Sequence, residues 1–525
     1  RGEGLLRLAV VVAVFLSITG LAVFFRFHQF DHVPENAAGI EADIADNVQD
    51  ILHGQLYIFM PRRIGEGGQL YFTAGLVKFL GMPLDYNAIK ATTAVAGMLA
   101  VGATYLLLRE VFSDRLVAVV GALFMAVAHW PVTVSRLALT MGSAPLWAAL
   151  VLLFLIRALK YNRTNDFLLC GLSAGLGLYF YQGFRAVPFL IAACLGVKIL
   201  IALLRRDWKG GLGIVGRGLL LGTMLVIVFA PMARAWHDDP TYYMAAVRSR
   251  ATGEGMDTEY NVLGRFARNV QNAFYMFNWR GDGNNQNNIP GRIALDQGMA
   301  AMLLVGAALA ISAWLRSRRN LLPYLLLVFL AFLLPSALAL AFPGENPSFG
   351  RTAGVIPLAF GFIALPVAFV LSTLWRAFSR RLGPAVASLA LVGLMIPLAV
   401  SNYSWYFHDY SASYDSLSYP TSAVAEAVQE GMKNNRAIQT VFVIGYPGWL
   451  DPRGVRVELG EPDWLKGVYP LPDSPPRGAL YVLAPDDIES RQRLEAIYPD
   501  GHLQWHFGRW GEGDAFLLFT PTPSP

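Results

Sequence analysis

The sequence predicts an all-α polytopic membrane protein that carries a small α/β domain at its C-terminal end. Three observations predict this fold class. The 525 residues are 55% hydrophobic and only 15% charged. About eleven apolar runs are each long enough to cross a bilayer, whose apolar core of about 30 Å requires roughly 20 residues of helix. After residue 402 the composition becomes that of a soluble domain.

The apolar runs follow one another along the chain up to residue 402. They lie at about 5–26, 90–108, 116–133, 143–158, 167–182, 186–204, 212–235, 298–315, 321–341, 352–375 and 383–402. Only a helix satisfies the backbone of such a run in lipid, because each hydrogen bond then closes within the segment. Cys170 and Cys194 both fall within predicted spans, so we expect buried thiols and no disulfide framework.

Basic residues mark one set of alternate loops. They are Arg109 and Arg115; Arg157, Lys160 and Arg163; Arg205, Arg206 and Lys209; Arg316, Arg318 and Arg319; and Arg376, Arg380 and Arg381. Cytoplasmic loops carry such an excess of Lys and Arg, so the N-terminus is predicted to be cytoplasmic in a multi-pass plasma-membrane protein. This distribution also accounts for the net charge of +5 without a nucleic-acid partner.

The same topology predicts two domains, 1–402 in the membrane and 403–525 outside the cytoplasm. Long external loops are expected at 27–89 and 236–297. In the C-terminal part, a helical pattern at 421–434 precedes apolar β-type runs at 440–446 and 478–485, a charged helix near 487–498 and two terminal strands. Strands that alternate with helices indicate a small α/β domain. It shows no nucleophile–base set and no metal-ligand spacing, so we assign it no chemistry.

The first external loop contains the acidic stretch GIEADIADNVQDIL, residues 39–52. On a helix, Asp43, Asp46 and Asp50 form one narrow stripe, which is typical of a solvated face. Glu41 instead falls among the apolar side chains. Burial of a carboxylate is costly unless it is paired or used, so Glu41 is either a structural partner of an arginine or a functional group.

Arginines accompany these acids in the other predicted external segments. PRRIGEGGQLYF contributes Arg62, Arg63 and Glu66, with glycines that let the backbone approach a ligand closely. Arg136, Arg185 and Arg351 each lie at the mouth of a span, and NWRGDGNNQNNIPGR contributes Arg280, Asp282 and Arg292. Each arginine alone is typical of a structural ion pair or an interface anchor. Several arginines beside one inward carboxylate indicate an anion site next to a general base.

The order of these motifs resembles that of the GT-C glycosyltransferases of the protein O-mannosyltransferase and ArnT type. The resemblance rests on motifs in this order: GIEAD after the first span, GEGGQLYFTAGLVKFLG, the Ser135-Arg136 turn, the RGD…NxPGR-like loop at 280–292, and Arg351 with Pro357 downstream. The resemblance covers nearly the whole chain. It implies a GT-C fold and transfer of a sugar from a polyprenyl-phosphate donor to a protein, lipid or glycan acceptor on the external face, with inversion.

The resemblance also implies residue roles. Glu41, or Asp43 next to it, would activate the acceptor, and basic residues would hold the lipid phosphate. The candidate donor contacts are Arg136, Arg280, Arg292, Arg351, Arg62, Arg63 and Glu66. Arginine is suited to stabilising phosphate charge as the glycosidic bond breaks. No cofactor is expected, although Glu41 and Asp43 could instead form a metal-binding pair.

Two departures from the family pattern leave an alternative open. Ile40 occupies the position of the usual aspartate in the first motif, and Ser348 replaces a histidine that often precedes the late arginine. The alternative is a non-catalytic GT-C-like membrane subunit or lipid-binding scaffold in a larger complex. A transporter is disfavoured, because the predicted spans hold almost no acids whereas ion-coupled carriers place charged groups near the membrane midplane.

Overall fold

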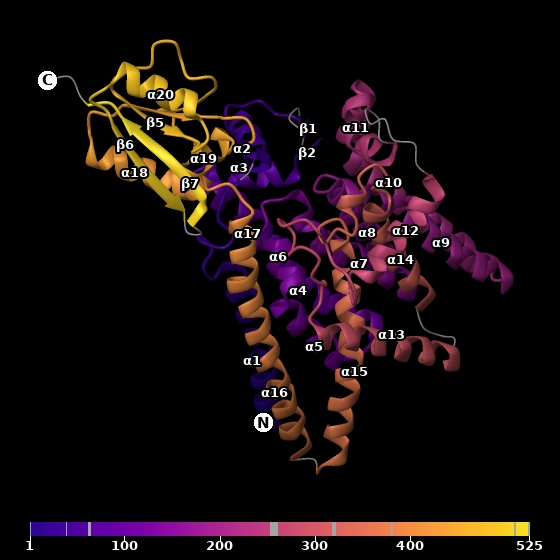
Figure 1. Cartoon of the computed structure of the whole chain (residues 1–525). Coiled ribbons are helices and arrows are strands. Elements are labelled where there is room, and N and C mark those ends of the chain that lie inside the picture. The colour runs from indigo at the N-terminus through magenta and orange to yellow at the C-terminus, as the bar shows by residue number, and fades with distance from the viewer. Residues whose placement is uncertain are drawn as a thin grey trace.

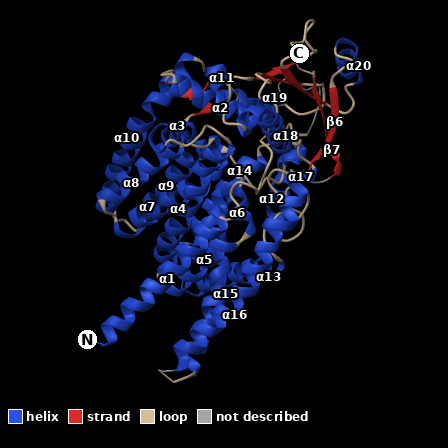
Figure 2. Cartoon of the chain, turned by 90° about the vertical axis from the view of Figure 1, so that its left-hand side faces the viewer, coloured by secondary structure: helices blue, strands red, loops and turns tan. Residues whose placement is uncertain are grey.

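The computed structural model describes the whole chain except residues 1, 38, 61–64, 253–260, 318–321, 380–381, 509–510 and 523–525. A bundle of long helices makes up most of the molecule, and a sheet domain lies at one end of the bundle (Figures 1 and 2). We call this end the sheet side of the bundle.

Eight helical segments of the described chain are long and apolar enough to cross a membrane. They contain α1 (Gly2–Phe27), α4 (Tyr86–Phe112), α7 (Ala144–Tyr161), α9 (Val187–Leu204), α10 (Trp208–Asp238), α13 (Gln297–Ser317), α15 (Ile356–Ala377) and α16 (Leu382–Ser404). The three other predicted spans also contain helices. One is the bent pair α5 (Arg115–Val127) and α6 (His129–Arg136), and two are the shorter helices α8 (Thr164–Gly177) and α14 (Leu322–Ala337). Every predicted span therefore contains a helix, and the predicted all-α membrane class is confirmed. The expected number of about eleven transmembrane helices is not, because α8 and α14 are too short to count among the candidate spans of the described chain.

The bend of 56° between α5 and α6 has a local cause. Ala128 adopts an extended conformation, and Pro131 lies in the first turn of α6, where a missing N–H group costs little. The last carbonyls of α5 are not left unsatisfied, because the buried Arg26 of α1 donates to Ala126 O (3.0 Å) and Met125 O (3.3 Å). The bend turns α6 toward the chain that follows α1, where Arg136 binds.

The predicted loop 27–89 folds into helices and a short hairpin on the sheet side. It contains α2 (Gly39–Leu52), β1 (Phe59–Met60), β2 (Gly65–Glu66) and α3 (Gly68–Leu80), with β1 antiparallel to β2. The predicted loop 236–297 contains α11 (Pro240–Thr252) and α12 (Val262–Tyr275). Figure 1 shows α2 and α3 beside the sheet domain. The segments expected to carry the site are thus ordered elements.

The C-terminal part is the predicted α/β domain. Its elements are α18 (Thr421–Asn434), β3 (Thr440–Ile444), α19 (Pro452–Glu458), β4 (Leu465–Val468), β5 (Ala479–Leu483), α20 (Ile488–Ile497), β6 (His502–Gly508) and β7 (Gly511–Thr520). The sheet order is β4-β3-β5-β7-β6, with β3 parallel to its two neighbours and β7 antiparallel to its own. Helices α18 and α20 cover opposite faces. The sequence analysis did not identify α19 or β4, which lie in a stretch rich in Pro and Gly.

A single helical segment joins the two parts. It begins at Leu382 and runs to Ser416, through a π-helical stretch η5 (Trp405–Tyr410) and α17 (Ser411–Ser416). The helix therefore continues past residue 402, where the sequence analysis placed the domain boundary. A packed run of aromatic rings along η5 and α17, from Trp405 to Tyr414, fixes this connection against the bundle.

Candidate functional site

Glu66 is placed by an unusually tight turn. Gly65 has a positive φ of 80°, and a Cβ atom on Gly68 would lie 2.7 Å from the carbonyl oxygen of Tyr179. Gly68 N instead donates to that oxygen at 2.8 Å. The glycines of the sequence GEGG thus allow close approach, as the sequence analysis expected, but to the chain after α8. This packing buries Glu66, which is 1% exposed.

Arg185, in the short helix η2 (Gln182–Ala186), is the ion-pair partner of Glu66. Its Nη2 lies 2.9 Å from Glu66 Oε1, and its Nη1 donates to Tyr243 O at 3.1 Å. The guanidinium also lies over the Tyr243 ring, 3.9 Å from the ring centre. Two segments of the chain, the GEGG turn and α11, therefore hold this arginine in one orientation.

Two further arginines belong to the same region. Glu345 bridges them: it forms an ion pair with Arg351 and lies 3.4 Å from Arg250 Nε. Tyr181 connects them to the first pair, because the charges of Arg351, Arg250 and Glu66 all act on its phenol. We call Glu66, Tyr181, Arg185, Arg250, Glu345 and Arg351 the basic cluster. It joins elements from four separate parts of the sequence.

Two buried polar atoms of the basic cluster have no hydrogen-bond partner within the described chain. They are Glu66 Oε2 and Arg351 Nη1. Buried polar groups in folded proteins are nearly always satisfied, so these two atoms are candidates for contact with a bound group. The side chain of Gln182 also hydrogen-bonds the Glu66 carboxyl. Burial also raises the pKa of the Glu66 carboxyl to about 7, although the guanidinium of Arg185 opposes this shift. A carboxylate with that pKa is suited to general-base catalysis near neutral pH.

The predicted RGD…NxPGR-like loop binds the turn that carries Arg351 of the cluster. Asp282 is buried and accepts hydrogen bonds from Phe349 N (2.8 Å), Asn284 N (2.8 Å) and Asn287 Nδ2 (3.1 Å). Burial raises the pKa of its carboxyl to about 6. Because Phe349 lies two residues before Arg351, Asp282 fixes the turn that presents this arginine.

Arg280 and Arg292 from the same loop lie elsewhere. Both are exposed, and Arg292 forms an ion pair with Asp409 of η5 at 3.2 Å. No contact in the described chain joins either arginine to the basic cluster. Of the predicted donor contacts, the structure therefore brings Glu66 and Arg351 together and leaves these two apart.

Glu41 is buried on α2, as predicted from the helical pattern, with 3% exposure. Its neighbours, however, are the phenols of Tyr86 and Tyr414, on which its charge acts. The Tyr414 hydroxyl donates to Asn36 O at 3.3 Å, which places this group at the junction with the C-terminal part. Glu41 and the basic cluster thus occupy different surroundings.

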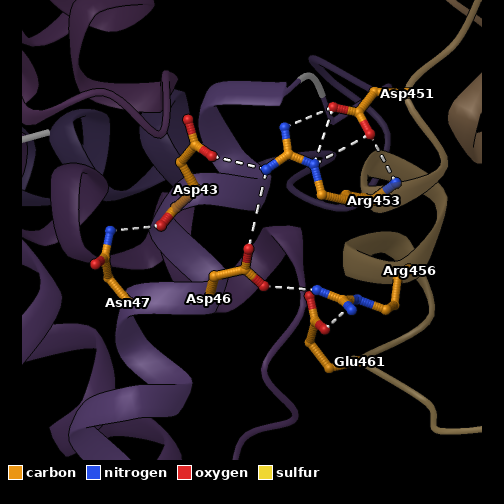
Figure 3. A network of polar contacts seen from close by, with 7 residues as sticks. All are labelled: Asp43, Asp46, Asn47, Asp451, Arg453, Arg456 and Glu461. Carbon is orange, nitrogen blue, oxygen red and sulfur yellow. Dashed lines mark hydrogen bonds and ion pairs between the residues drawn. The ribbon is translucent and has the colours of Figure 1, made fainter. Parts of the chain in front are cut away.

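The prediction that the aspartates of α2 form a solvated face is wrong for two of them. Asp43 is buried and lies 2.8 Å from Arg453 Nη1, while Asp46 lies 2.6 Å from Arg456 Nη2 (Figure 3). Both arginines belong to α19. The acidic stripe faces the C-terminal domain, because two oppositely charged helices meet there. Asp43 therefore serves domain docking in this structure, and its carboxylate is engaged by Arg453.

Acids of the C-terminal domain also bind the two arginines of this interface. Asp451 also binds Arg453 at 2.8 Å, and Glu461 binds Arg456 Nε at 2.6 Å (Figure 3). These acids hold the two guanidinium groups in place from the side of the C-terminal domain. Asp451, together with Asp43, raises the pKa of Arg453 further above its ordinary value. At the other end of α19, Glu458 accepts a hydrogen bond from Ala37 N at 2.6 Å.

Reversing one charge of the Asp43–Arg453 pair is expected to destabilise the docked domain, and reversing both is expected to restore it. Asp43→Arg brings two guanidinium groups together, whereas Asp43→Arg combined with Arg453→Asp recreates an ion pair. We expect a coupling energy of about 1 kcal/mol, kept small because the Arg453 side chain is 43% exposed. Thermal unfolding of the four proteins measures it. Strictly additive effects would show that the pair contributes nothing.

Arg136 has a structural environment. Its side chain makes five hydrogen bonds to backbone carbonyls of residues 25–33, with distances of 2.6 to 3.3 Å. Its guanidinium also lies over the rings of Phe30, Tyr406 and Phe407. Since all of its N–H groups are engaged, Arg136 fixes the turn after α1 and presents no donor to a phosphate. This revises its predicted role.

Arg62 and Arg63 lie outside the described residues. The part of the chain that the structure describes also holds no group of three or more His, Cys, Asp or Glu side chains that could bind a metal ion. The predicted alternative of a metal pair at Glu41 and Asp43 would have to use an aspartate that already binds Arg453. Cys170 and Cys194 are both buried and free, as expected.

Four members of the basic cluster were not among the candidate site residues: Tyr181, Arg185, Arg250 and Glu345. Arg185 was noted in the sequence only as an external arginine at the mouth of a span. Arg250 lies in α11 within the sequence VRSR, and nothing in its spacing distinguishes it from other arginines of the predicted loop. Its position at the cluster results from the packing of α11 against the end of α10. The only local signal for the Glu345–Arg351 pair is the acid-bearing turn GEN, which lies shortly before the arginine of SFGR.

Residues 70–236 match the family model described as dolichyl-phosphate-mannose-protein mannosyltransferase. No curated protein sequence matches the chain. The structure is similar to that of ArnT from Cupriavidus metallidurans bound to undecaprenyl phosphate, with a TM-score of 0.53 and 13% identity over 97% of this chain and 98% of that one. The chain has the GT-C fold of ArnT.

The apo structure of the same ArnT gives a TM-score of 0.51 and 13% identity over 99% of this chain and 98% of the other. The shared GT-C fold extends through the C-terminal domain, because both chains are covered almost completely. The matched family residues run from α3 to α10 and include Tyr181 and Arg185 of the basic cluster. The family match and the fold both support the class predicted from the sequence, a membrane glycosyltransferase of the protein O-mannosyltransferase and ArnT type.

Proposed function

We propose that the chain transfers a sugar from a polyprenyl-phosphate donor to an acceptor, with the basic cluster at the donor phosphate and Glu66 as general base. The basic cluster carries this proposal, because it combines three arginines with a buried carboxyl whose pKa is raised to about 7. Sugar transfer from a lipid phosphate requires cations that stabilise the charged leaving group and a base that takes the proton of the acceptor.

The proposed step is a single displacement. Glu66 Oε2 accepts the proton of the acceptor hydroxyl while the acceptor oxygen forms a bond to the anomeric carbon. The bond between that carbon and the phosphate oxygen breaks on the opposite side, so the configuration inverts. The electron pair of the broken bond remains on the departing polyprenyl phosphate. Arg351 and Arg250 stabilise that developing charge, since preorganised cations are effective at a developing anion.

Arg185 has a positioning role in this mechanism. Its ion pair engages Glu66 Oε1, and we assign proton acceptance to the other oxygen, Oε2. The same pair keeps the carboxyl from becoming too basic, because the guanidinium opposes the effect of burial. The proposed step uses side chains alone, and we propose no metal or other cofactor.

We further propose that the sheet side of the bundle faces outside the cytoplasm and the N-terminus faces the cytoplasm. The alternation of basic loops supports this orientation. The donor then enters from the bilayer and the acceptor from the external solution. The ArnT structure bound to undecaprenyl phosphate supports a polyprenyl phosphate as the lipid, and a protein, lipid or glycan as the acceptor remains our expectation together with membrane-complex partners.

One observation favours the non-catalytic alternative. Ile40, at the position of the usual acid, is 42% exposed, and the neighbouring acids of α2 are occupied by Tyr86, Tyr414 and Arg453. If Glu41 or Asp43 were required for transfer, this chain would be a lipid-binding scaffold. Our proposal differs because it places the base at Glu66.

The pH dependence of transfer tests the proposed base. Since Glu66 acts in its deprotonated form and its pKa is raised to about 7, kcat is expected to fall about tenfold per pH unit below pH 7 and to level off above it. The assay follows labelled sugar from a polyprenyl-phosphate donor between pH 5 and pH 8.5 in purified, lipid-reconstituted protein. A profile that is flat from pH 5.5 upward would contradict Glu66 as the base.

A further inference from the structure

A cavity of 700 Å³ lies where the bundle meets the C-terminal domain, and no residue of the basic cluster lines it. Its walls come from the chain after α1, from η5 and α17, from α18, and from strands β6 and β7. The cavity is therefore an interdomain feature that exists only while the C-terminal domain is docked.

The cavity reaches around the open edge of the sheet. β6 is the terminal strand of the sheet, and within the described residues it pairs with β7 alone. Two consecutive residues of this strand, His506 and Phe507, line the cavity. Because successive side chains of a strand point to opposite faces of the sheet, the cavity extends to both sides of the strand. On the same strand, the exposed rings of Trp505 and Phe507 stack with their centres 6.3 Å apart. An open strand edge is a template for pairing with an extended chain.

The lining of the cavity is acidic. Four carboxyl side chains reach it: Glu35, Asp415, Glu426 and Glu430. Among the described lining residues there is no lysine or arginine, and the other ionisable side chains are His32, His408 and His506. This contrasts with the chain as a whole, which has a net charge of +5. Charge complementarity therefore selects a basic occupant.

The spacing of two of these acids matches a strand. Glu426 and Glu430 are both exposed and lie one turn apart on α18, so their side chains are roughly 6 Å apart. Alternate residues of an extended chain are roughly 6.6 Å apart on one face. Basic residues at every second position of a strand beside β6 would thus meet these two acids in turn.

We infer that this cavity binds an extended, basic polypeptide segment, which pairs with the edge of β6 and directs alternate Lys or Arg side chains to Glu426 and Glu430. The inference deepens the proposed function, because it assigns the segment to an acceptor polypeptide. Binding itself requires neither a donor nor transfer, so the two ideas are separable by experiment.

The test measures binding of a labelled peptide of alternating lysine and threonine to the full chain in zwitterionic nanodiscs. We expect saturable binding that weakens about tenfold in Glu426→Gln/Glu430→Gln and weakens with added salt. The matched control is Glu489→Gln/Glu495→Gln, which removes the same charge from α20 on the opposite face of the sheet. The control is expected to bind the peptide as the wild type does.

Three ligands separate strand pairing from charge alone. The same peptide with N-methylated alternate residues keeps its charge but loses edge hydrogen bonds, and we expect it not to bind. Equal binding by this peptide, by spermine or by a chitosan oligomer would overturn the inference, as would equal loss in both double variants. Glu66→Gln is expected to bind the peptide normally. Transfer without peptide binding would refute this inference alone, and peptide binding without transfer would refute the proposed function alone.

Discussion

Glu66→Gln is expected to lower kcat for sugar transfer by about 10²- to 10⁴-fold, the usual contribution of a positioned general base. Glutamine keeps the shape of the side chain and a hydrogen-bond acceptor for Arg185, but it cannot take the acceptor proton. The remaining activity is expected to lose the titration near pH 7. Steady-state kinetics with a polyprenyl-phosphate sugar measure both effects.

The control for this variant is Glu41→Gln, which removes another buried carboxylate of the same predicted loop. Because Glu41 lies against Tyr86 and Tyr414, we expect it to affect thermal stability more than kcat. Wild-type kcat in Glu66→Gln together with lost transfer in Glu41→Gln would move the base to α2. Donor binding by Glu66→Gln, measured separately, confirms that this variant is folded.

Arg351→Ala is expected to lower kcat by about 10²- to 10³-fold, the scale found when one preorganised donor to a developing anion is removed. Its Nη1 is buried and unsatisfied in the described chain, so it is the donor most available to the phosphate. The loss is expected mainly in kcat, because the charge on the phosphate increases as the bond breaks. Arg351→Lys is expected to recover part of the activity, since lysine keeps the charge without the planar fork.

The control is Arg292→Ala. Arg292 was an equal candidate from the sequence, but in the structure it is exposed and paired with Asp409. We expect its removal to change kcat and KM little. If Arg292→Ala and Arg351→Ala reduced transfer equally, the assignment of the phosphate to the basic cluster would fail.

Local patterns were sufficient to predict the helices of the membrane spans and most of the C-terminal domain. The apolar runs contain their own hydrogen bonds, so their helical state does not depend on distant residues. The helical pattern at 421–434 became α18, and the apolar β-type run at 440–446 became β3, although the hydrogen bonds of β3 go to β4 and β5. α19 was missed because seven residues that start with a proline in a Gly-rich stretch give no period to count.

The site was harder to predict because its contacts are distant in sequence. The helical pattern correctly buried Glu41, but it could not show that Asp43 and Asp46 meet Arg453 and Arg456, about 410 positions later. Conversely, Glu66 carries no periodic signal at all. Its importance comes from the glycines around it, which bring it to Arg185. All N–H groups of Arg136 are bonded within the chain, whereas Arg351 keeps one buried nitrogen without a partner in the described residues. This difference follows from the packing of the chain and has no signal in the sequence.

The most direct test of the central claim is a transfer assay with the purified wild-type chain in lipid. A panel of labelled polyprenyl-phosphate sugars is supplied with a membrane extract as the source of acceptors, and Glu66→Gln is assayed beside it. We predict that label from at least one donor moves to an acceptor with the wild type and not with the variant. Polyprenyl-phosphate binding without transfer from any donor that a related active enzyme uses would contradict the account and identify a lipid-binding scaffold.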